Sequence, residues 1–248
     1  MNTHFKIIIP FYNVENWTKA CIRSVKRQDY DNYQCIIVDD MSTDNSLSLV
    51  LEETKDDEKF LVVENTEKKY ALRNIYEAIE ISKPLEDDVI VTLDGDDWFA
   101  GTNILTKLND TYQQEKCLLT YGSYAEYPSG RRGKFSRKIP DTIIKESSYR
   151  KNEWNASHLR TFKYKLWKKI LKEDLLDSSG KFYEMAWDLS FMFPMLEMAG
   201  ERSKYIDDIL YIYNIANPIN DHKVNHEKQL YYESLIRSKN PYRTWKEE

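Results

Sequence analysis

Short apolar segments alternate with amphipathic segments along the first half of the chain. Five apolar segments are rich in Ile, Val and Leu and bounded by polar residues, which predicts buried β-strands. They are residues 5–9, 35–38, 60–63, 89–93 and 117–121. Apolar positions at helical spacing fill the gaps between them, at residues 17–27, 46–53, 71–82 and 103–115. This order predicts βαβ units and an α/β fold with a mostly parallel, Rossmann-like sheet.

The alternation becomes irregular after about residue 125. Residues 127–149 predict loops and short elements, and residues 205–213 predict a strand or a hairpin. Helical patterns recur at residues 156–171, 187–198 and 227–237. Because no internal repeat or low-complexity linker separates the two halves, we expect a single domain.

Composition narrows the class of protein. The mean hydropathy of -0.69 and the lack of a long apolar run exclude a transmembrane helix, and the N-terminus has no secretory-signal pattern. Three cysteines without a CxxC pair argue against a disulfide framework and favour a reducing, cytoplasmic setting. The first glycine is Gly95, so the first third holds neither a GxGxxG nor a P-loop cradle. Most dehydrogenases and P-loop NTPases are thereby excluded.

Three carboxylates, Asp94, Asp96 and Asp97, directly follow the fourth apolar segment. Like charges this close repel one another unless a cation or hydrogen bonds compensate. An Asx turn that merely ends a strand is the alternative, and three aspartates at the mouth of a parallel sheet fit it poorly. An EF-hand fails because Phe99 and Leu105 stand where its glycine and glutamate are needed. Hard oxygen ligands predict Mg²⁺ or Mn²⁺ shared with substrate phosphates.

Three segments at predicted strand ends resemble family 2 glycosyltransferases, which have the GT-A fold. They are IPFYN at residues 9–13, VDDMSTDNS at residues 38–46 and LDGDDW at residues 93–98. The match in order and spacing covers about the first 125 residues. The resemblance implies one GT-A domain, with residues 1–125 binding the nucleotide sugar. Residues 126–248 would then form the acceptor-side part, with the catalytic base and closing helices.

The resemblance implies that the first strand end and the second aspartate of the Asp-Asp pair hold the nucleotide base. These residues are Pro10, Phe11, Tyr12, Asn13 and Asp40. A carboxylate can accept a hydrogen bond from a uracil imide, while an aromatic ring covers the face of the base. The alternative is that Phe11 and Tyr12 are core aromatics and that Asp40 caps a helix.

The family also tends to carry an Asn-x-Gly segment followed by Ala-x-Arg-Asn. This chain has Asn65-Thr66-Glu67 and then Ala71-Leu72-Arg73-Asn74, so the glycine is missing. Arg73 is expected to pair with Asp94 or to reach the ribose.

The Asp-x-Asp motif of the family corresponds to Asp94 and Asp96. The resemblance implies that Asp94 lies near the ribose and that Asp96 binds the metal, Mn²⁺ or Mg²⁺, that bridges the phosphates. Asp97 would be a further ligand or would support the ligands. His222 lies where some GT-A enzymes place a third metal ligand; a surface histidine is the alternative.

An inverting glycosyltransferase needs a base that accepts the proton of the attacking hydroxyl. The family usually supplies it from an acidic element that begins a helix about 90 residues after the Asp-x-Asp motif. Asp188 lies there, with Trp187 where an acidic residue is common, and we expect it to be the base. The alternative is a carboxylate that only favours the helix dipole.

Positive charge gathers in residues 131–172, which hold fourteen of the 36 basic residues and three of the 41 acidic ones. The segment therefore carries +11, although the chain as a whole carries -5. A charge run is usually a solvated face, but this one is interleaved with aromatic residues and suits an anionic acceptor: glycan, nucleic acid or lipid headgroups. His158, expected to open a helix here, and Arg160 are candidates to bind acceptor or phosphate; a satisfied buried histidine is the alternative.

The sequence therefore predicts a metal-dependent inverting glycosyltransferase. It would move a sugar from a nucleotide diphosphate, most readily UDP, to a hydroxyl acceptor such as an anionic glycan or modified nucleic acid. A non-catalytic nucleotide-sugar or glycan-binding module remains an alternative. So does a sugar-nucleotidyltransferase, although the chain lacks the glycine- and arginine-rich N-terminal loop such enzymes use. Peripheral membrane contact is compatible with the basic segment.

Overall fold

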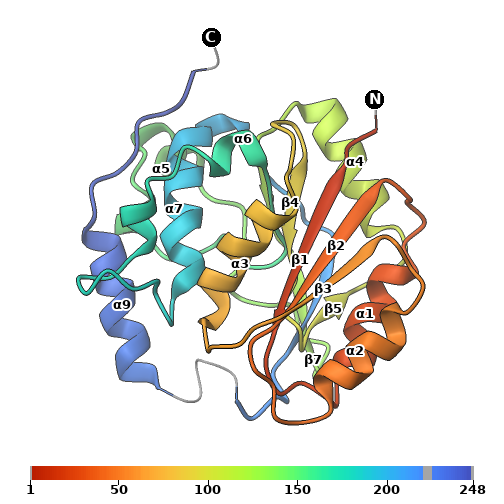
Figure 1. The fold of residues 1–248 in the computed structure, drawn as a ribbon. Coiled ribbons are helices and arrows are strands. Elements are labelled where there is room, and N and C mark those ends of the chain that lie inside the picture. The colour runs from red at the N-terminus through yellow and green to blue at the C-terminus, as the bar shows by residue number, and fades with distance from the viewer. Residues whose placement is uncertain (1, 220–224, 247–248) are drawn as a thin grey trace.

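The computed structural model describes residues 2–219 and 225–246, built around a seven-stranded sheet (Figure 1). The strand order is β3-β2-β1-β4-β8-β6-β9. Five strands confirm the predicted segments: β1 (Phe5–Phe11), β2 (Tyr33–Asp39), β3 (Phe60–Glu64), β4 (Val89–Thr92) and β6 (Leu119–Tyr121). The other two are β8 (Arg160–Lys163) and β9 (Ser203–Tyr205). Only β8 runs antiparallel to its neighbours in this sheet, so the predicted α/β fold with a mostly parallel sheet is confirmed.

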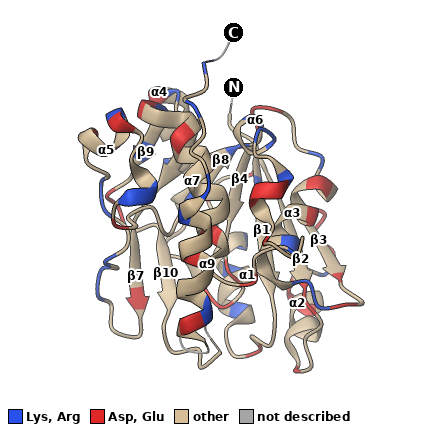
Figure 2. Cartoon of the chain, turned by 90° about the vertical axis from the view of Figure 1, so that its left-hand side faces the viewer, with Lys and Arg blue, Asp and Glu red and all other residues tan. Residues whose placement is uncertain are grey.

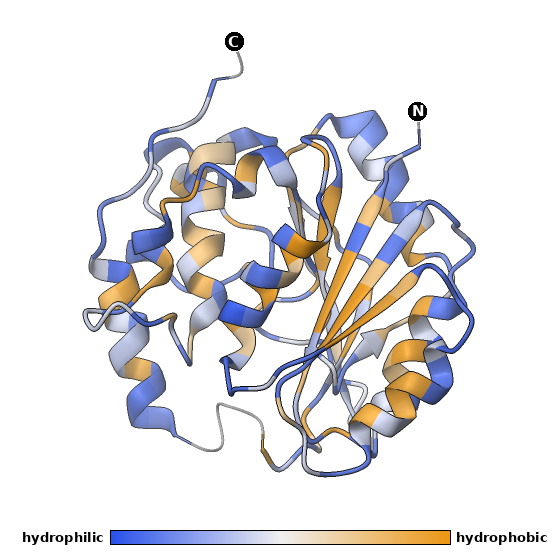
Figure 3. Ribbon diagram, viewed as in Figure 1, coloured by the Kyte–Doolittle hydropathy of each residue, from blue (hydrophilic) through white to orange (hydrophobic). Residues whose placement is uncertain are grey.

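Helices cover both faces of this sheet because its strands are apolar on both sides. Ile7 and Ile9 of β1 face one core, and Ile8 faces the other. The first core is closed by α1 (Thr18–Lys26), α2 (Ser46–Thr54) and α4 (Ile104–Glu115). The second is closed by α3 (Tyr70–Ile81), α7 (Trp187–Ala199) and α9 (His226–Ser238). Figure 3 shows apolar residues concentrated on the strands and on the inner sides of these helices.

A small second sheet lies beyond the carboxyl end of β4. It consists of β5 (Trp98–Phe99), β10 (Tyr211–Asn214) and β7 (Tyr124–Tyr127), in the order β5-β10-β7. The segment predicted as a strand or hairpin at residues 205–213 contributes to two sheets, because β9 joins the large sheet and β10 the small one. β10 thereby reaches the loop that follows β4.

The predicted helix over residues 156–171 is wrong. Residues 160–163 form β8, which pairs with β4 and β6, and only a short α6 (Tyr164–Trp167) follows. Thr161 and Phe162 favour a β-strand. Pairing with the exposed edge of β4 gives this segment backbone hydrogen bonds between strands, and these outweigh its local helical preference. His158 therefore precedes a strand instead of opening a helix.

The remaining elements are short. They are α5 (Asp141–Glu146) and the 3₁₀ turns η1 (Tyr149–Lys151), η2 (Lys172–Leu175) and η3 (Gly200–Arg202). Residue 125 lies within β7, and β4 pairs with β8, so both parts of the chain build the same sheets. Cys21, Cys35 and Cys117 are buried free thiols. Among residues 2–219 and 225–246, none of the helices has the length and apolar character needed to span a membrane.

Candidate active site

The loop after β4 lies directly against the end of β1. The Gly95 N–H donates a hydrogen bond of 3.2 Å to the Pro10 carbonyl. A Cβ at Gly95 would come within 2.4 Å of the Phe11 Cβ, so only glycine allows this approach. Phe11 itself is 5% exposed and belongs to the core. The carboxyl ends of β1 and β4 therefore present their polar residues at one edge of the sheet.

Asp97 connects this loop to the small sheet. Its buried carboxylate accepts hydrogen bonds of 2.5 Å from the Tyr211 hydroxyl and 2.6 Å from the Asn214 N–H. Burial raises the pKa of Asp97 well above its ordinary value, and the neighbouring charges of Asp96 and Asp94 add to the rise. Asp97 thus fixes the loop in place through both of its oxygens.

Asp94 faces the interior of the site. Its carboxylate accepts hydrogen bonds of 3.4 Å from Arg160 and 3.4 Å from the Tyr211 hydroxyl. Burial raises the pKa of Asp94, and Arg160 and Tyr211 oppose that rise. The partner arginine is Arg160 and not Arg73, which pairs with Glu67 and Glu77 on the surface.

Arg160 links Asp94 to the candidate base. Its buried guanidinium donates hydrogen bonds of 3.2 Å to Asp188 and 3.3 Å to the Thr92 hydroxyl, besides the one to Asp94. The ring of Trp187 lies 5.1 Å from the guanidinium carbon. Because β8 lies beside β4 in antiparallel register, Arg160 stands opposite Thr92 and reaches both carboxylates.

Asp188 lies in the first turn of α7. Burial raises the pKa of its carboxyl, Arg160 lowers it, and the charge of Asp94 raises it further. The result is a pKa above the ordinary value of an aspartate. A carboxylate of this kind holds a proton more firmly than an exposed one, as a general base requires.

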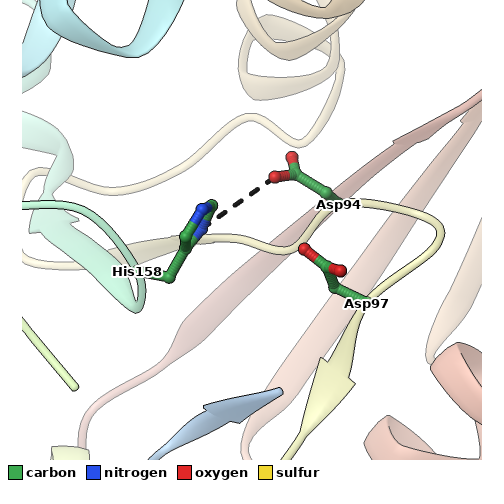
Figure 4. Close-up of side chains that lie close together, drawn as sticks. All are labelled: Asp94, Asp97 and His158. Atoms are coloured by element: carbon green, nitrogen blue, oxygen red, sulfur yellow. Dashed lines mark ion pairs between the residues drawn. The ribbon is translucent and has the colours of Figure 1, made fainter. Parts of the chain in front are cut away.

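His158 lies beside Asp94 and Asp97 (Figure 4) and packs among aromatic rings. Its imidazole stacks on Tyr211 at 4.5 Å and on Tyr213 at 5.1 Å between ring centroids. Burial lowers the pKa of His158 well below its ordinary value, with Arg160 adding to the effect, so the ring is neutral. Its buried Nδ1 has no hydrogen-bond partner among the described residues and lies 4.0 Å from Asp94.

These side chains form a donor set that fits a divalent cation. One ligand atom each from Asp94, Asp97 and His158 lie within 4.8 Å of one another. Carboxylate oxygens suit either Mn²⁺ or Mg²⁺, and the neutral imidazole nitrogen favours Mn²⁺ of the two. Both oxygens of Asp97 already accept hydrogen bonds, which leaves Asp94 and the unpartnered nitrogen of His158 as the freer donors of this group.

Asp96, on the same loop, is not one of those three residues. Its carboxylate accepts a hydrogen bond of 2.6 Å from the Asn217 side-chain amide. Asn217 follows β10 and leads toward residues 220–224. The predicted metal ligand His222 lies outside the described residues.

The predicted base-binding residues lie at the ends of β1 and β2. Asn13 is fixed by the loop after β2, since its N–H donates to the Ser42 hydroxyl and its side chain accepts from the Thr43 N–H. Tyr12 is 38% exposed and offers its ring to the site. Pro10 is buried within β1.

The Asp40 carboxylate already has protein partners. It accepts hydrogen bonds from the backbone N–H groups of Lys69 and Tyr70, at 2.8 Å and 3.0 Å, and from the Asn65 amide at 3.1 Å. Burial raises the pKa of Asp40, but hydrogen bonds to its carboxylate, such as that from the Lys69 N–H, and the Lys68 ammonium outweigh that effect and lower it. Asp40 thereby fixes the start of α3, and its contact with the base stays a prediction.

Lys68 occupies the space between these groups. Its ammonium lies 3.2 Å from an Asp40 oxygen and 2.8 Å from the centroid of the Tyr12 ring. The sequence analysis did not identify Lys68, Tyr211 or Asn217, because each acts through a contact with a residue far away in the sequence. In the sequence, the only indication that the loop before α3 differs from that of the family was Glu67, which stands in place of the family's glycine.

One surface groove is not lined by Asp94, Asp97 or Asp188. It has a volume of about 860 Å³ and lies between α4, α5 and β9. Tyr121, Ile139 and Tyr205 contribute to its lining. The carboxylates and Arg160 therefore define the site by their chemistry and not by the depth of a pocket.

The GT-A glycosyltransferases share this fold. S. aureus TarS (residues 1–349, in complex with UDP-GlcNAc) aligns with a TM-score of 0.65 at 17% identity, over 94% of this chain and 65% of that one. A mannosyltransferase from Pyrobaculum calidifontis, in complex with GDP-Man and Mn²⁺, aligns with a TM-score of 0.62 at 17% identity, over 98% of this chain and 66% of that one. The chain belongs to glycosyl transferase family 2, whose family model matches residues 6–175. The family that the sequence resembles is thereby confirmed.

Several curated relatives are larger proteins. Glycosyltransferase GlyA of Streptococcus pneumoniae is 27% identical over 84% of this chain, which spans only 30% of the length of GlyA. The poly(ribitol-phosphate) beta-glucosyltransferase of Bacillus spizizenii is 30% identical over 57% of the chain and 21% of its own length. The teichoic acid poly(glycerol phosphate) polymerase of Staphylococcus epidermidis is 35% identical over 42% of the chain and 15% of its own length.

Proposed function

We propose that this chain transfers a sugar from a nucleotide diphosphate donor to an acceptor hydroxyl, with inversion at the anomeric carbon and with a divalent cation. The observation that carries the proposal is the buried Arg160, which holds Asp94 and Asp188 at the carboxyl edge of the sheet. A binding module needs no carboxylate with a raised pKa at this position. Asp188 has one, because burial and the charge of Asp94 raise it.

In this proposal Asp188 accepts the proton of the acceptor hydroxyl while the hydroxyl oxygen attacks the anomeric carbon. The bond from that carbon to the diphosphate oxygen breaks on the opposite face, and the electron pair leaves with the nucleoside diphosphate. Arg160 keeps Asp188 in place for this transfer. Asp96 and Asp94, with Nδ1 of His158, would hold Mn²⁺ or Mg²⁺, which neutralises the diphosphate when bound.

UDP-sugars are the favoured donors. TarS binds UDP-GlcNAc, and the Pyrobaculum mannosyltransferase binds GDP-Man with Mn²⁺, so nucleotide diphosphate sugars occupy this fold. Two relatives act on poly(ribitol phosphate) or make poly(glycerol phosphate), as their names state, which supports a phosphate-bearing acceptor. Residues 10–16 contain neither glycine nor arginine, which disfavours a sugar-nucleotidyltransferase.

The test is a transfer assay. A panel of UDP- and GDP-sugars is incubated with Mn²⁺ and poly(ribitol phosphate) or poly(glycerol phosphate), and the mass of the product is measured. Asp188→Asn should lower kcat by about 10²–10⁴-fold with unchanged UDP affinity. Asp87→Asn, near the amino end of β4, serves as the control. Tight UDP binding without turnover would support a binding module, and pyrophosphate release from UTP and a sugar phosphate would support a nucleotidyltransferase.

A further inference from the structure

An exposed basic strip lies beside the candidate active site. Residues 131–138 read RRGKFSRK, five basic residues among eight with no acidic one. All five of these basic side chains are exposed, and we refer to them together as the basic strip: Arg131, Arg132, Lys134, Arg137 and Lys138. Gly133 and Ser136 between them are buried, so the backbone is anchored while the charged side chains point outward.

Two close contacts anchor this backbone to the wall of the site. A Cβ on Gly133 would come within 1.9 Å of the Tyr124 ring, so only glycine lets the chain pack on that ring. The Ser136 hydroxyl donates a hydrogen bond of 2.8 Å to the His158 carbonyl. The Tyr124 ring meets the His158 ring edge-on at 5.5 Å. The backbone of this segment is therefore linked to Asp94 through the side chains of Tyr124 and His158.

Three charges of the strip are uncompensated. Arg132 pairs with Asp207, and Lys138 lies 3.7 Å from Asp141. Throughout residues 2–219 and 225–246, no carboxylate lies within 4.0 Å of the charged groups of the other three, Arg131, Lys134 and Arg137. In Figure 2 this loop, beside β7 and leading to α5, carries Lys and Arg.

Several other basic residues of the segment are paired with carboxylates away from the strip. Lys163 and Lys165 pair with Asp87 near the amino end of β4, and Arg150 pairs with the buried Glu197. Their charges serve the fold and are not available at the site. Arg160 of the same segment lies inside the site, where it pairs with Asp94 and Asp188.

We propose that the basic strip binds successive phosphates of a phosphodiester-linked acceptor chain and so delivers one of its hydroxyls to Asp188. This inference rests on the proposed function. Arginine and lysine side chains on an anchored backbone suit phosphate oxygens. Phe135 is 46% exposed, with the Lys134 ammonium 4.8 Å from its ring, and offers apolar contact to a polyol unit. A single aromatic ring is a poor platform for stacked bases, which disfavours single-stranded nucleic acid.

The test compares two triple variants that each remove three positive charges. The first is Arg131→Gln, Lys134→Gln, Arg137→Gln. The control is Lys55→Gln, Lys83→Gln, Lys116→Gln, at exposed positions that follow α2, α3 and α4 at the opposite edge of the sheet. Binding of fluorescein-labelled poly(glycerol phosphate) is measured by anisotropy at low and physiological salt. We expect the strip variant to weaken the Kd about tenfold, to lose most of the salt dependence and to raise KM for the polymer.

Each outcome decides the proposal. Equal Kd values for the two variants would overturn it, as would tighter binding of a single-stranded DNA oligonucleotide or full competition by neutral dextran. The proposed function is tested separately. A wild-type protein that binds the polymer through the basic strip but transfers no sugar from any donor would refute the proposed transferase activity. It would not affect the proposal that the strip binds phosphates. Transfer with a KM unchanged in the strip variant would refute the strip alone.

Discussion

Nη1 of Arg160 lies 3.2 Å from a carboxylate oxygen of Asp188, and the same guanidinium reaches Asp94 at 3.4 Å. A buried charge pair of this kind gives little net stability, because desolvation of both partners offsets their attraction. Its value is geometric, since one rigid, permanently charged group sets the distance between two carboxylates that would otherwise repel. Removing that group should change the protonation of Asp188 before it changes the fold.

We predict that Arg160→Gln shifts the acid limb of the pH–kcat profile to higher pH. A base works only when deprotonated, so the rate falls as the pH drops through its pKa. Burial and Asp94 already raise the pKa of Asp188, and only Arg160 opposes them strongly, so its loss raises the pKa further. Lys163→Gln, on the same strand, is the control. A limb that stays in place in Arg160→Gln would show that Asp188 is not the titrating base.

Lys68 should compete with the nucleobase. Its ammonium lies on the face of the Tyr12 ring, 2.8 Å from the centroid, so a base stacked on that face must displace it. A cation–π contact contributes about 0.5–2 kcal/mol, which corresponds to roughly two- to thirtyfold in affinity. We therefore expect Lys68→Met to tighten uridine binding within this range, as measured by calorimetry. Lys69→Met, which removes the neighbouring pair with Glu77, is the control. Unchanged or weaker uridine binding in Lys68→Met would contradict the prediction.

The metal assignment can be separated from the packing of the loop. Asp96→Ala should abolish the increase in UDP affinity that Mn²⁺ produces. The reason is that the metal shared with the phosphates of UDP loses a carboxylate ligand. Asn217→Ala is the matched control, since it removes the 2.6 Å hydrogen bond to Asp96 but leaves the carboxylate. Both variants are titrated with UDP in Mn²⁺ and in EDTA. A full Mn²⁺ effect in Asp96→Ala would exclude Asp96 as a ligand.

The local pattern of apolar residues was sufficient to predict the first half of the fold. The strands of β1 to β4 are apolar on both faces and need no distant partner to be recognised. The polar residues that follow them, such as Asp40 and Asp94, reach one edge of the sheet because parallel strands end there. The family relationship itself follows from these residues.

The second half of the fold depends on contacts between residues far apart in the sequence, which the local pattern does not show. Residues 160–163 have a helical pattern and become β8, because pairing with β4 outweighs local propensity. The bridge from Arg160 to Asp188 could not be predicted without that strand. The bond from Tyr211 to Asp97 spans 114 residues and likewise has no signature in the sequence.

Arg150 should be the most sensitive stability position outside the site. It donates hydrogen bonds to the buried Glu197 and to the Ile236 carbonyl, which joins α7 to α9. Burial raises the pKa of Glu197 and Arg150 opposes the rise, so Arg150→Leu leaves a buried carboxylate without its charged partner and with only the Tyr242 N–H bonded to it. We expect a loss of about 3–5 kcal/mol in the free energy of unfolding at neutral pH. The loss should shrink as the pH falls, because protonation of Glu197 in the folded state removes the buried charge.

Lys168→Leu, which breaks an exposed pair with Glu86, should cost far less in the same urea titration. A loss for Arg150→Leu that is small, or the same at acid pH, would show that this pair does not hold the C-terminal helix to α7.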